Sequence, residues 1–383
     1  MSKIRVLIVI NDLLPGGAQK IATDIASRVD HVQFDITVSF FTSHPESETL
    51  ADTLRDMGVT LISLEGRGVL QKMAALIKTI RHERIQVIQT FLPYAGIIGR
   101  LAGVLTGTPV ISAQCNLPHT YPLRVRVLDA LTLPLVKAWV GNTSGIEMKY
   151  GGTSSIFSEE AWQKGRRHFT LYAGVDVAAI QARVQNVTTE MLRKSLSIPP
   201  GMPLLMMTAR LISWKGHRTL LEALPLLPRT HLLLVGWGPL ESELKECATR
   251  LGIEDRVHFL GRRKDAIELL AITDCYVQTH ETGKEGIWIG PNLSQIEACA
   301  AAVPSVSSAV PHIEELLKDG VTGRLARVDD PNDLARVIQE VLGNRDTSDL
   351  LAHAAQKIVK ERFSVQAMVH VYESLYHHTV RDL

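Results

Sequence analysis

The sequence lacks any apolar run long enough to cross a bilayer, and it has few cysteines and little charge imbalance. A transmembrane helix needs about 18 or more consecutive apolar residues. The 41 Lys and Arg residues nearly balance 40 Asp and Glu residues, which argues against nucleic acid as the main partner. The four cysteines stand far apart without a Cys-x-x-Cys spacing, so disulfide and metal sites are not expected. A strand-like run starts at Ile4 without the features of a signal peptide, and we expect a soluble, cytoplasmic protein.

Two nucleotide-related motifs are also missing. No Gly-x-Gly-x-x-Gly fingerprint follows the first strand-like run, which disfavours a nicotinamide cofactor. No Asp-x-Asp motif occurs in the chain, so we expect no metal requirement and no cofactor. The chain has 383 residues, of which 45% are hydrophobic. This length favours two domains.

What the sequence does contain is a regular alternation of short β-branched runs and helical patterns. Such alternation predicts parallel sheets covered by helices on both faces. The expected architecture is α/β, with two doubly wound Rossmann-like domains that face a central cleft. The expected strands are 4–10, 34–40, 60–64, 87–89, 110–112, 138–140, 204–208, 231–235, 257–259, 275–279 and 305–307.

The stretch Gly290-Pro291-Asn292-Leu293 predicts the start of a helix. Free N–H groups of Asn292, Leu293 and Ser294 would lie at the positive end of the helix dipole, which favours a phosphate. Glu297 lies one turn further on, where its carboxylate could accept hydrogen bonds from a sugar diol. Together these features suggest a nucleotide-sugar site.

Other candidate ligand contacts follow predicted strands. Arg210 and Lys215 come just after the strand 204–208, and a pair of cations can bind two phosphoryl groups without a metal. Either residue alone would more often be a solvated surface charge. Gly16 and Gly17 follow the first strand and would let the backbone approach a ligand, although a tight turn explains them too.

These segments together resemble glycosyltransferase family 4, a family of retaining enzymes with the GT-B fold. The resemblance is carried by Gly16-Gly17-Ala18, Arg210…Lys215-Gly216, Val235-Gly236-Trp237-Gly238-Pro239, Val257-His258-Phe259-Leu260-Gly261 and Pro291-Asn292…Glu297-Ala298. It covers nearly the whole chain and is strongest from about 204 to 376. It implies an acceptor-binding domain over 1–175, a nucleotide-sugar-binding domain over 195–363, and a final helix at 364–383 that crosses back to the first domain.

The resemblance also implies roles for single residues. Arg210 and Lys215 match the pair that holds the donor diphosphate, and Glu297 matches the glutamate that holds the ribose. Gly16 and Gly17 match the loop near the donor phosphates and the acceptor. Gly261 and Arg262 fall where the base is received, and Pro291, Asn292 and Leu293 complete the donor site.

Two positions depart from the family pattern. The position of the family's first glutamate is occupied here by Ile289. Glu285 is the favoured substitute, Glu281 is the second candidate, and the absence of any equivalent stays open. In the first domain, relatives place a histidine after the strand 110–112. Here His119 is displaced along the loop, and Asn116 could supply the polar contact.

The expected activity is transfer of a sugar from a nucleotide diphosphate sugar, with UDP favoured, to a hydroxyl of a glycan or lipid-linked acceptor. Arg210, Lys215 and Glu285 would be the catalytic residues, and membrane association would be at most peripheral, at the inner face. Two alternatives stay open: a catalytically silent GT-B binding module and a nucleotide-sugar epimerase. Donor turnover by the wild type and by Glu285→Ala distinguishes them.

Overall fold

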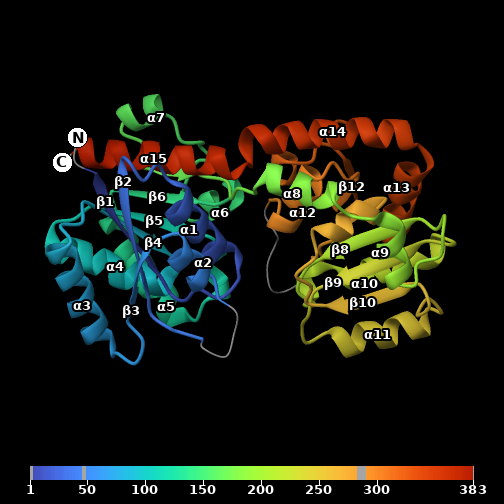
Figure 1. Ribbon diagram of the computed structural model, residues 1–383, viewed down its shortest axis with the longest axis horizontal. Coiled ribbons are helices and arrows are strands. Elements are labelled where there is room, and N and C mark those ends of the chain that lie inside the picture. The colour runs from blue at the N-terminus through green and yellow to red at the C-terminus, as the bar shows by residue number, and fades with distance from the viewer. Residues whose placement is uncertain (1–2, 45–48, 283–289, 383) are drawn as a thin grey trace. The chain divides into compact units, whose positions relative to one another are not determined.

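The computed structural model describes residues 3–44, 49–282 and 290–382. The chain divides into two compact units, of which the first comprises Met1–Gly174 with Val365–Leu383 and the second comprises Val175–Ser364. Each unit contains one sheet of parallel strands with helices packed on it (Figure 1). The predicted α/β class is therefore confirmed.

The first unit contains a seven-stranded sheet in the order β3-β2-β1-β4-β5-β6-β7. Its central strands β1, β4, β5 and β6 are largely buried on both faces, which explains why apolar residues predominate in them. The strands are β1 Ile4–Ile10, β2 Phe34–Phe40, β3 Thr60–Ser63, β4 Val87–Phe91, β5 Val110–Gln114, β6 Ala138–Gly141 and β7 His168–Thr170. The helices are α1 Gly17–Arg28, α2 Ala51–Asp56, α3 Val69–His82, α4 Pro93–Thr106, η1 Pro118–Thr120, α5 Leu123–Thr132, η2 Leu133–Leu135, α6 Ser144–Lys149, α7 Glu159–Gln163 and α15 Val365–Arg381.

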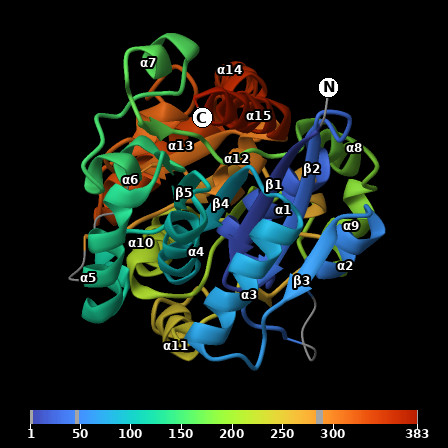
Figure 2. The same cartoon turned by 90° about the vertical axis from the view of Figure 1, so that its left-hand side faces the viewer.

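The helices of the first unit form two layers. Figure 2 shows α4 between α3 and α5, and these three helices pack side by side. The C-terminal helix α15 packs against α1 and the strands β1 and β4. Two contacts fix α15 there. The rings of Tyr376 and Phe34 pack edge to face with their centroids 6.0 Å apart, and a carboxylate oxygen of Glu373 accepts a hydrogen bond from the Asp30 N–H at 2.7 Å.

A fully buried arginine holds α4, α5 and the sheet together. Arg100 of α4 forms an ion pair of 2.8 Å with Asp129 of α5, and it donates hydrogen bonds to Thr132 and to Ser112 of β5. Burial lowers the pKa of Arg100, while the charge of Asp129 opposes the change. A Cβ at Gly96 would lie 2.8 Å from the Arg100 guanidinium. The absence of a side chain at Gly96 therefore makes room for this ion pair.

The second unit contains a six-stranded sheet in the order β10-β9-β8-β11-β12-β13. Its core is built from leucine, valine and methionine side chains of β8, β9, α10 and α13. The strands are β8 Leu204–Thr208, β9 His231–Val235, β10 Val257–Gly261, β11 Cys275–Gln278, β12 Ser305–Ser308 and β13 Arg324–Ala326. The helices are α8 Val177–Gln185, α9 Thr189–Ser195, η3 Ser213–Lys215, α10 His217–Ala223, η4 Leu224–Leu226, α11 Glu241–Arg250, η5 Glu268–Ile272, α12 Leu293–Ala300, η6 Ile313–Glu315, α13 Pro331–Gly343 and α14 Arg345–Arg362.

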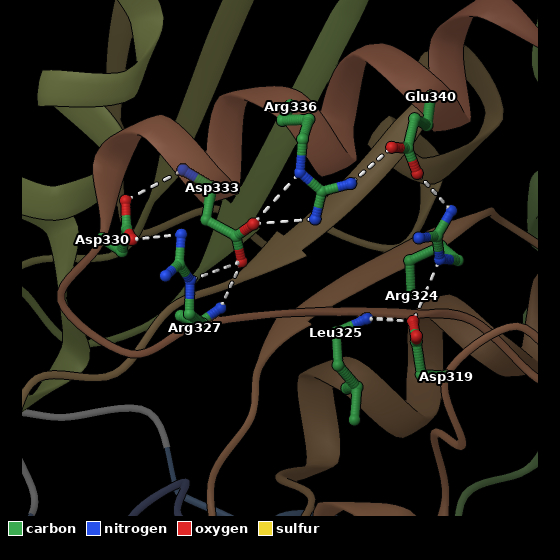
Figure 3. A network of polar contacts seen from close by, with 8 residues as sticks. All are labelled: Asp319, Arg324, Leu325, Arg327, Asp330, Asp333, Arg336 and Glu340. Carbon is green, nitrogen blue, oxygen red and sulfur yellow. Dashed lines mark hydrogen bonds and ion pairs between the residues drawn. The ribbon is translucent and has the colours of Figure 1, made fainter.

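Ion pairs attach the edge strand β13 to helix α13 (Figure 3). Arg324 bonds both Asp319 and Glu340, at 3.0 and 2.6 Å, and Glu340 in turn bonds Arg336. The buried carboxylate of Asp333 accepts hydrogen bonds from Arg336 and from the Arg327 N–H. Exposed pairs contribute little individually, so the network mainly fixes the position of this short edge strand.

Candidate functional site

The strand order of the second sheet reverses between β8 and β11. In parallel α/β sheets, ligands bind beside the carboxyl ends of the strands at such a switch point. The turn after β8 contains Arg210 and Lys215, and it ends at Gly216 with φ of 66°. A Cβ at Gly216 would lie 2.8 Å from the backbone nitrogen of His280. Glycine is therefore needed here both for the left-handed conformation and for the close approach of the two chains.

Thr279, which directly follows β11, fixes this turn. Its hydroxyl lies 3.1 Å from the carbonyl oxygen of Lys215 and 2.8 Å from that of Gly216. The Lys215 side chain is consequently held in a buried position, at 7% exposure, whereas Arg210 is exposed. Burial and the nearby positive charge of Arg210 lower the pKa of Lys215 to about 7.

Two buried histidines lie close to Lys215. Burial lowers the pKa of His217 to about 4, and the charge of Lys215 acts in the same direction. Burial and Lys215 also lower the pKa of His280 well below its ordinary value. A bound anion would favour the charged form of Lys215 and relieve this electrostatic cost. The switch point of the second unit is thus suited to a phosphate.

The helix after β11 starts later than the sequence predicted. Asn292 is the N-cap of α12, and its side-chain oxygen accepts a hydrogen bond from the Gln295 N–H at 2.8 Å. The predicted cap at Gly290 and the predicted place of Pro291 in the first turn are therefore wrong. The side chain of Asn292 caps the helix, so α12 begins at Leu293, after both residues. The N–H groups of Leu293 and Ser294 form the first turn and lack partners within the helix.

Ser294 joins this helix end to the switch point. Its hydroxyl lies 2.8 Å from the carbonyl oxygen of Thr208, the last residue of β8, and 3.0 Å from the hydroxyl of the buried Tyr276 on β11. The start of α12, the end of β8 and the turn that bears Lys215 are consequently parts of one hydrogen-bonded assembly.

Glu297 lies on the side of α12 that approaches α8. Arg183 of α8 bonds the carboxylate of Glu268 through two nitrogens at 2.8 and 2.6 Å. These hydrogen bonds raise the pKa of Arg183, and the negative charge of Glu297 acts in the same direction. Glu297 is partly exposed, so its carboxylate is accessible to a ligand.

The glycines after β9 and β10 bring loops together. A Cβ at Gly236 would lie 1.9 Å from the carbonyl oxygen of Ala209, and one at Gly238 would lie 2.3 Å from that of Leu211. The Gly236 N–H donates to the carbonyl oxygen of Gly261 at 2.8 Å. The glycines at 236 and 238 thus permit close packing of the loops that follow β8 and β9. Gly261 has a φ of 61°, and the neighbouring Arg262 is exposed.

Only one of the two candidates for the first glutamate lies within the described residues. Glu285 lies outside the described residues, as does Ile289. Glu281 is partly buried, and its N–H donates to the carbonyl oxygen of Trp214 at 3.3 Å. Burial raises the pKa of Glu281, and the charge of Asp329 adds to this. The roles of both glutamates stay predictions.

In the first unit, the sheet order reverses between β1 and β4, where the loop that contains Gly16 and Gly17 begins. Both glycines are exposed, and Gly16 caps α1 with extended backbone. The side-chain oxygen of Asn11 accepts a hydrogen bond from the Ala95 N–H at 3.0 Å. This bond holds the loop after β1 next to the first turn of α4 at the switch point.

The loop after β5 carries the two first-unit candidates. The Asn116 amide donates to the hydroxyl of Tyr121 at 2.8 Å, and burial raises the pKa of Tyr121 to about 12. Asn116 itself is exposed. The backbone of His119 belongs to the short helix η1, and its side chain is outside the described part.

Two further findings concern the described residues as a whole. No group of three or more His, Cys, Asp or Glu side chains in them is arranged to hold a metal ion. No helix in the described part of the chain is both long and apolar enough to span a membrane.

A family model described as glycosyl transferases group 1 matches residues 188–358. The match covers most of the second unit, and the matched residues are called the group 1 domain. The lipopolysaccharide core biosynthesis glycosyltransferase LpsE of Rhizobium meliloti is 27% identical over 242 residues, which are 63% of this chain and 66% of LpsE. The second relative is an Escherichia coli UDP-Gal:alpha-D-GlcNAc-diphosphoundecaprenol alpha-1,3-galactosyltransferase. It is 22% identical, and the match covers 98% of this chain and 97% of the E. coli chain. The N-acetyl-alpha-D-glucosaminyl L-malate synthase of Bacillus anthracis is 32% identical, but only 38% of its length is matched.

Solved structures place the group 1 domain and the first unit in one known fold. Anabaena Alr3699/HepE in complex with UDP has a TM-score of 0.81 at 21% identity, with 98% of this chain and all of that chain covered. The GT-B fold predicted from the sequence is thereby confirmed. Assignment of the whole chain to glycosyltransferase family 4 stays a prediction.

Several residues around the group 1 domain's switch point were not predicted. His217 directly follows Lys215 and Gly216 in the chain. Tyr276 and Thr279 lie within the predicted strand 275–279. Their sequence signal is weak, because only the tertiary fold reveals which polar side chains are buried beside Lys215. Arg183 lies on α8, within the expected connection between domains, where a single arginine gives no signal.

Proposed function

We propose that this protein is a retaining glycosyltransferase that uses a nucleotide diphosphate sugar, with UDP as the favoured nucleotide. The acceptor is a hydroxyl of a glycan or of a lipid-linked sugar. The observation that carries the proposal is the buried Lys215 beside the charge of Arg210, in a domain of the glycosyltransferases. The E. coli relative is named for a UDP-sugar and a diphosphoundecaprenol-linked acceptor, and HepE was solved with UDP-glucose.

In the proposed reaction, the bond between the anomeric carbon of the donor and its diphosphate oxygen breaks, and a bond to the acceptor oxygen forms on the same face. The acceptor proton passes to the leaving phosphate oxygen. Negative charge grows on the diphosphate in the transition state. Lys215 and the N–H groups of Leu293 and Ser294 would stabilise that charge, because the buried lysine and the backbone of the helix start are already fixed in place. The exposed Arg210 would add its positive charge.

The remaining roles concern binding of the donor. Glu297 would accept hydrogen bonds from the ribose hydroxyls, and the backbone around Gly261 and Arg262 would receive the base. Glu285 would contact hydroxyls of the donor sugar. The two cations supply the positive charge that a metal provides in other transferases, so we propose a reaction without a metal cofactor.

A screen of nucleotide sugars by thermal shift tests donor binding, since a ligand stabilises the folded protein by mass action. We expect a rise in Tm with a UDP-sugar for the wild type and for Lys194→Ala, which changes an exposed lysine on α9. Lys215→Ala should show no rise. Transfer to acceptors should then be followed by mass spectrometry, with the anomeric configuration of the product read by NMR.

The outcomes separate the alternatives. Product with inverted configuration would contradict the retaining mechanism. Donor binding without any transfer or hydrolysis by the wild type would indicate a silent binding module. Turnover that survives in Lys215→Ala would contradict the role given to the lysine.

A further inference from the structure

Helix α5 of the first unit has its polar side buried and its apolar side exposed. Asp129 and Thr132 face the protein and bind the buried Arg100. Leu123 and Leu131 are 70% and 68% exposed, and Val127 between them is about half exposed. These three residues follow the i, i+4, i+8 spacing of one helix face. A helix on the surface of a water-soluble protein normally has the opposite arrangement.

A pocket of about 570 Å³ lies along the flank of the same helix. This volume is within the range of about 300–1,000 Å³ that is usual for ligand sites. α5 contributes Val125 and Ala130, and η2 contributes Leu133. The aromatic residues Tyr121, Trp139 and Tyr150 also line the pocket. The wall is therefore mostly apolar, which does not suit a sugar or a nucleotide.

Polar groups at this pocket would favour an anion. Arg126 and Lys149 line it and are exposed, and neither forms an ion pair with any residue that the structure describes. Asp129 also lines it, but its charge is paired with Arg100. The buried hydroxyl of Tyr150 has no hydrogen-bond partner among the described residues. The pocket thus combines an apolar interior with two available cations.

We propose that this pocket binds the apolar chain of a lipid carrier whose phosphate or diphosphate group contacts Arg126 and Lys149. The exposed face of α5 would touch the bilayer, and the chain would pass over Ala130 into the pocket. This inference rests on the proposed function and narrows its acceptor to a lipid-linked one. An exposed apolar surface beside cations fits a lipid bearing a negative head group.

Trp139 on the pocket wall provides a direct readout. A dodecyl phosphate with a nitroxide at the chain end should quench Trp139 fluorescence in the full-length protein in a saturable way. The quenched signal should be absent in Trp139→Phe, which assigns it among the five tryptophans. Unlabelled farnesyl diphosphate should reverse the quenching, whereas inorganic phosphate should not.

Two sets of variants test the site. Ala130→Phe fills the pocket from an exposed helix position without adding a tryptophan, and it should weaken lipid binding at least tenfold. Arg126→Gln with Lys149→Gln should weaken binding of the phosphate lipid several-fold and leave binding of uncharged dodecyl maltoside unchanged. The Tm rise with a UDP-sugar, measured on the same samples, shows that each variant is folded and tests donor binding separately.

Unchanged quenching in Ala130→Phe would overturn the proposal, as would the absence of saturable quenching in the wild type. Loss of binding in Leu131→Glu but not in Ala130→Phe would indicate adhesion to a bilayer through α5 alone. Concentration-dependent dimerisation abolished by Leu131→Glu would show that a second copy covers the helix. Either result would also overturn the pocket as a lipid site.

Discussion

Binding of a nucleotide diphosphate should cause Lys215 to take up a proton. In the unliganded protein its pKa is lowered to about 7 by burial and by Arg210, so only about a tenth of the molecules carry the charge at pH 8. A diphosphate in contact with the ammonium favours the charged form and should raise the pKa toward its ordinary value of about 10.4. Binding at pH 8 should therefore take up about 0.9 protons per UDP.

The assay is isothermal titration calorimetry of UDP at pH 8 in buffers with different ionisation enthalpies. The slope of the observed enthalpy against the ionisation enthalpy gives the number of protons exchanged. At this pH UDP is fully ionised, and the depressed pKa values of His217 and His280 keep them neutral. The slope therefore reports Lys215.

The affinity should also depend on pH. From pH 7 to pH 10, the free lysine loses its proton while the bound form keeps it, so Kd should rise by up to about tenfold per pH unit. Lys215→Arg is the matched control, since a guanidinium stays charged throughout this range. It should remove both the proton uptake and this pH dependence.

A slope near zero for the wild type at pH 8, with normal UDP affinity, would refute the reasoning. It would mean that the lysine is already charged in the unliganded protein or does not contact the diphosphate. Equal proton uptake by Lys215→Arg would show that another group titrates.

Three further predictions concern stability. Burial lowers the pKa of His217 to about 4, below the value of about 6.5 in the unfolded chain, so the folded protein loses stability as the pH falls and the unfolded chain takes up a proton. Between pH 8 and 5 this lowers the free energy of unfolding by about 2 kcal/mol. His217→Asn should remove that part of the pH dependence in urea unfolding. Gly236→Ala should destabilise the second unit by several kcal/mol more than Gly261→Ala, because only the first added Cβ meets backbone within 2 Å. Both variants suffer about 1–3 kcal/mol of backbone strain from a positive φ, and similar Tm values for the two would contradict this prediction. Asp129→Ala leaves the buried charge of Arg100 without its carboxylate and should lower the free energy of unfolding by about 3–5 kcal/mol. The double change Arg100→Met with Asp129→Leu should recover most of this stability in thermal unfolding. No recovery would show that the hydrogen bonds of the two side chains matter more than the ion pair.

The sequence predicted the strands well because most buried parallel strands are rich in β-branched and other apolar residues. Strands 4–10, 34–40, 204–208 and 231–235 have the predicted bounds. The edge strand β13 was not predicted. It has only three residues, and it begins with Arg324, which forms ion pairs and interrupts any apolar run. The start of α12 was misplaced because the side chain of Asn292, rather than Gly290, provides the cap.

The candidate site could be predicted only in part. Arg210 and Lys215 follow a recognisable strand, and the structure places them in one turn at the switch point of the sheet. What the sequence could not show is the burial of Lys215, because that depends on Thr279 and His280 from a distant strand. The inverted orientation of α5 was not predicted either, since a leucine-rich helix face normally indicates a core.

The anchoring of α5 through Arg100 has a consequence for how this chain can change over evolution. Because Asp129 and Thr132 hold the helix from its polar side, the exposed positions Leu123, Val127 and Leu131 carry little of the folding energy. Substitutions there can accumulate with little loss of stability, while the ion pair must be kept or replaced as a unit. The outer surface of α5 is therefore a part of the molecule where homologous proteins can acquire different membrane or protein partners without rebuilding the fold.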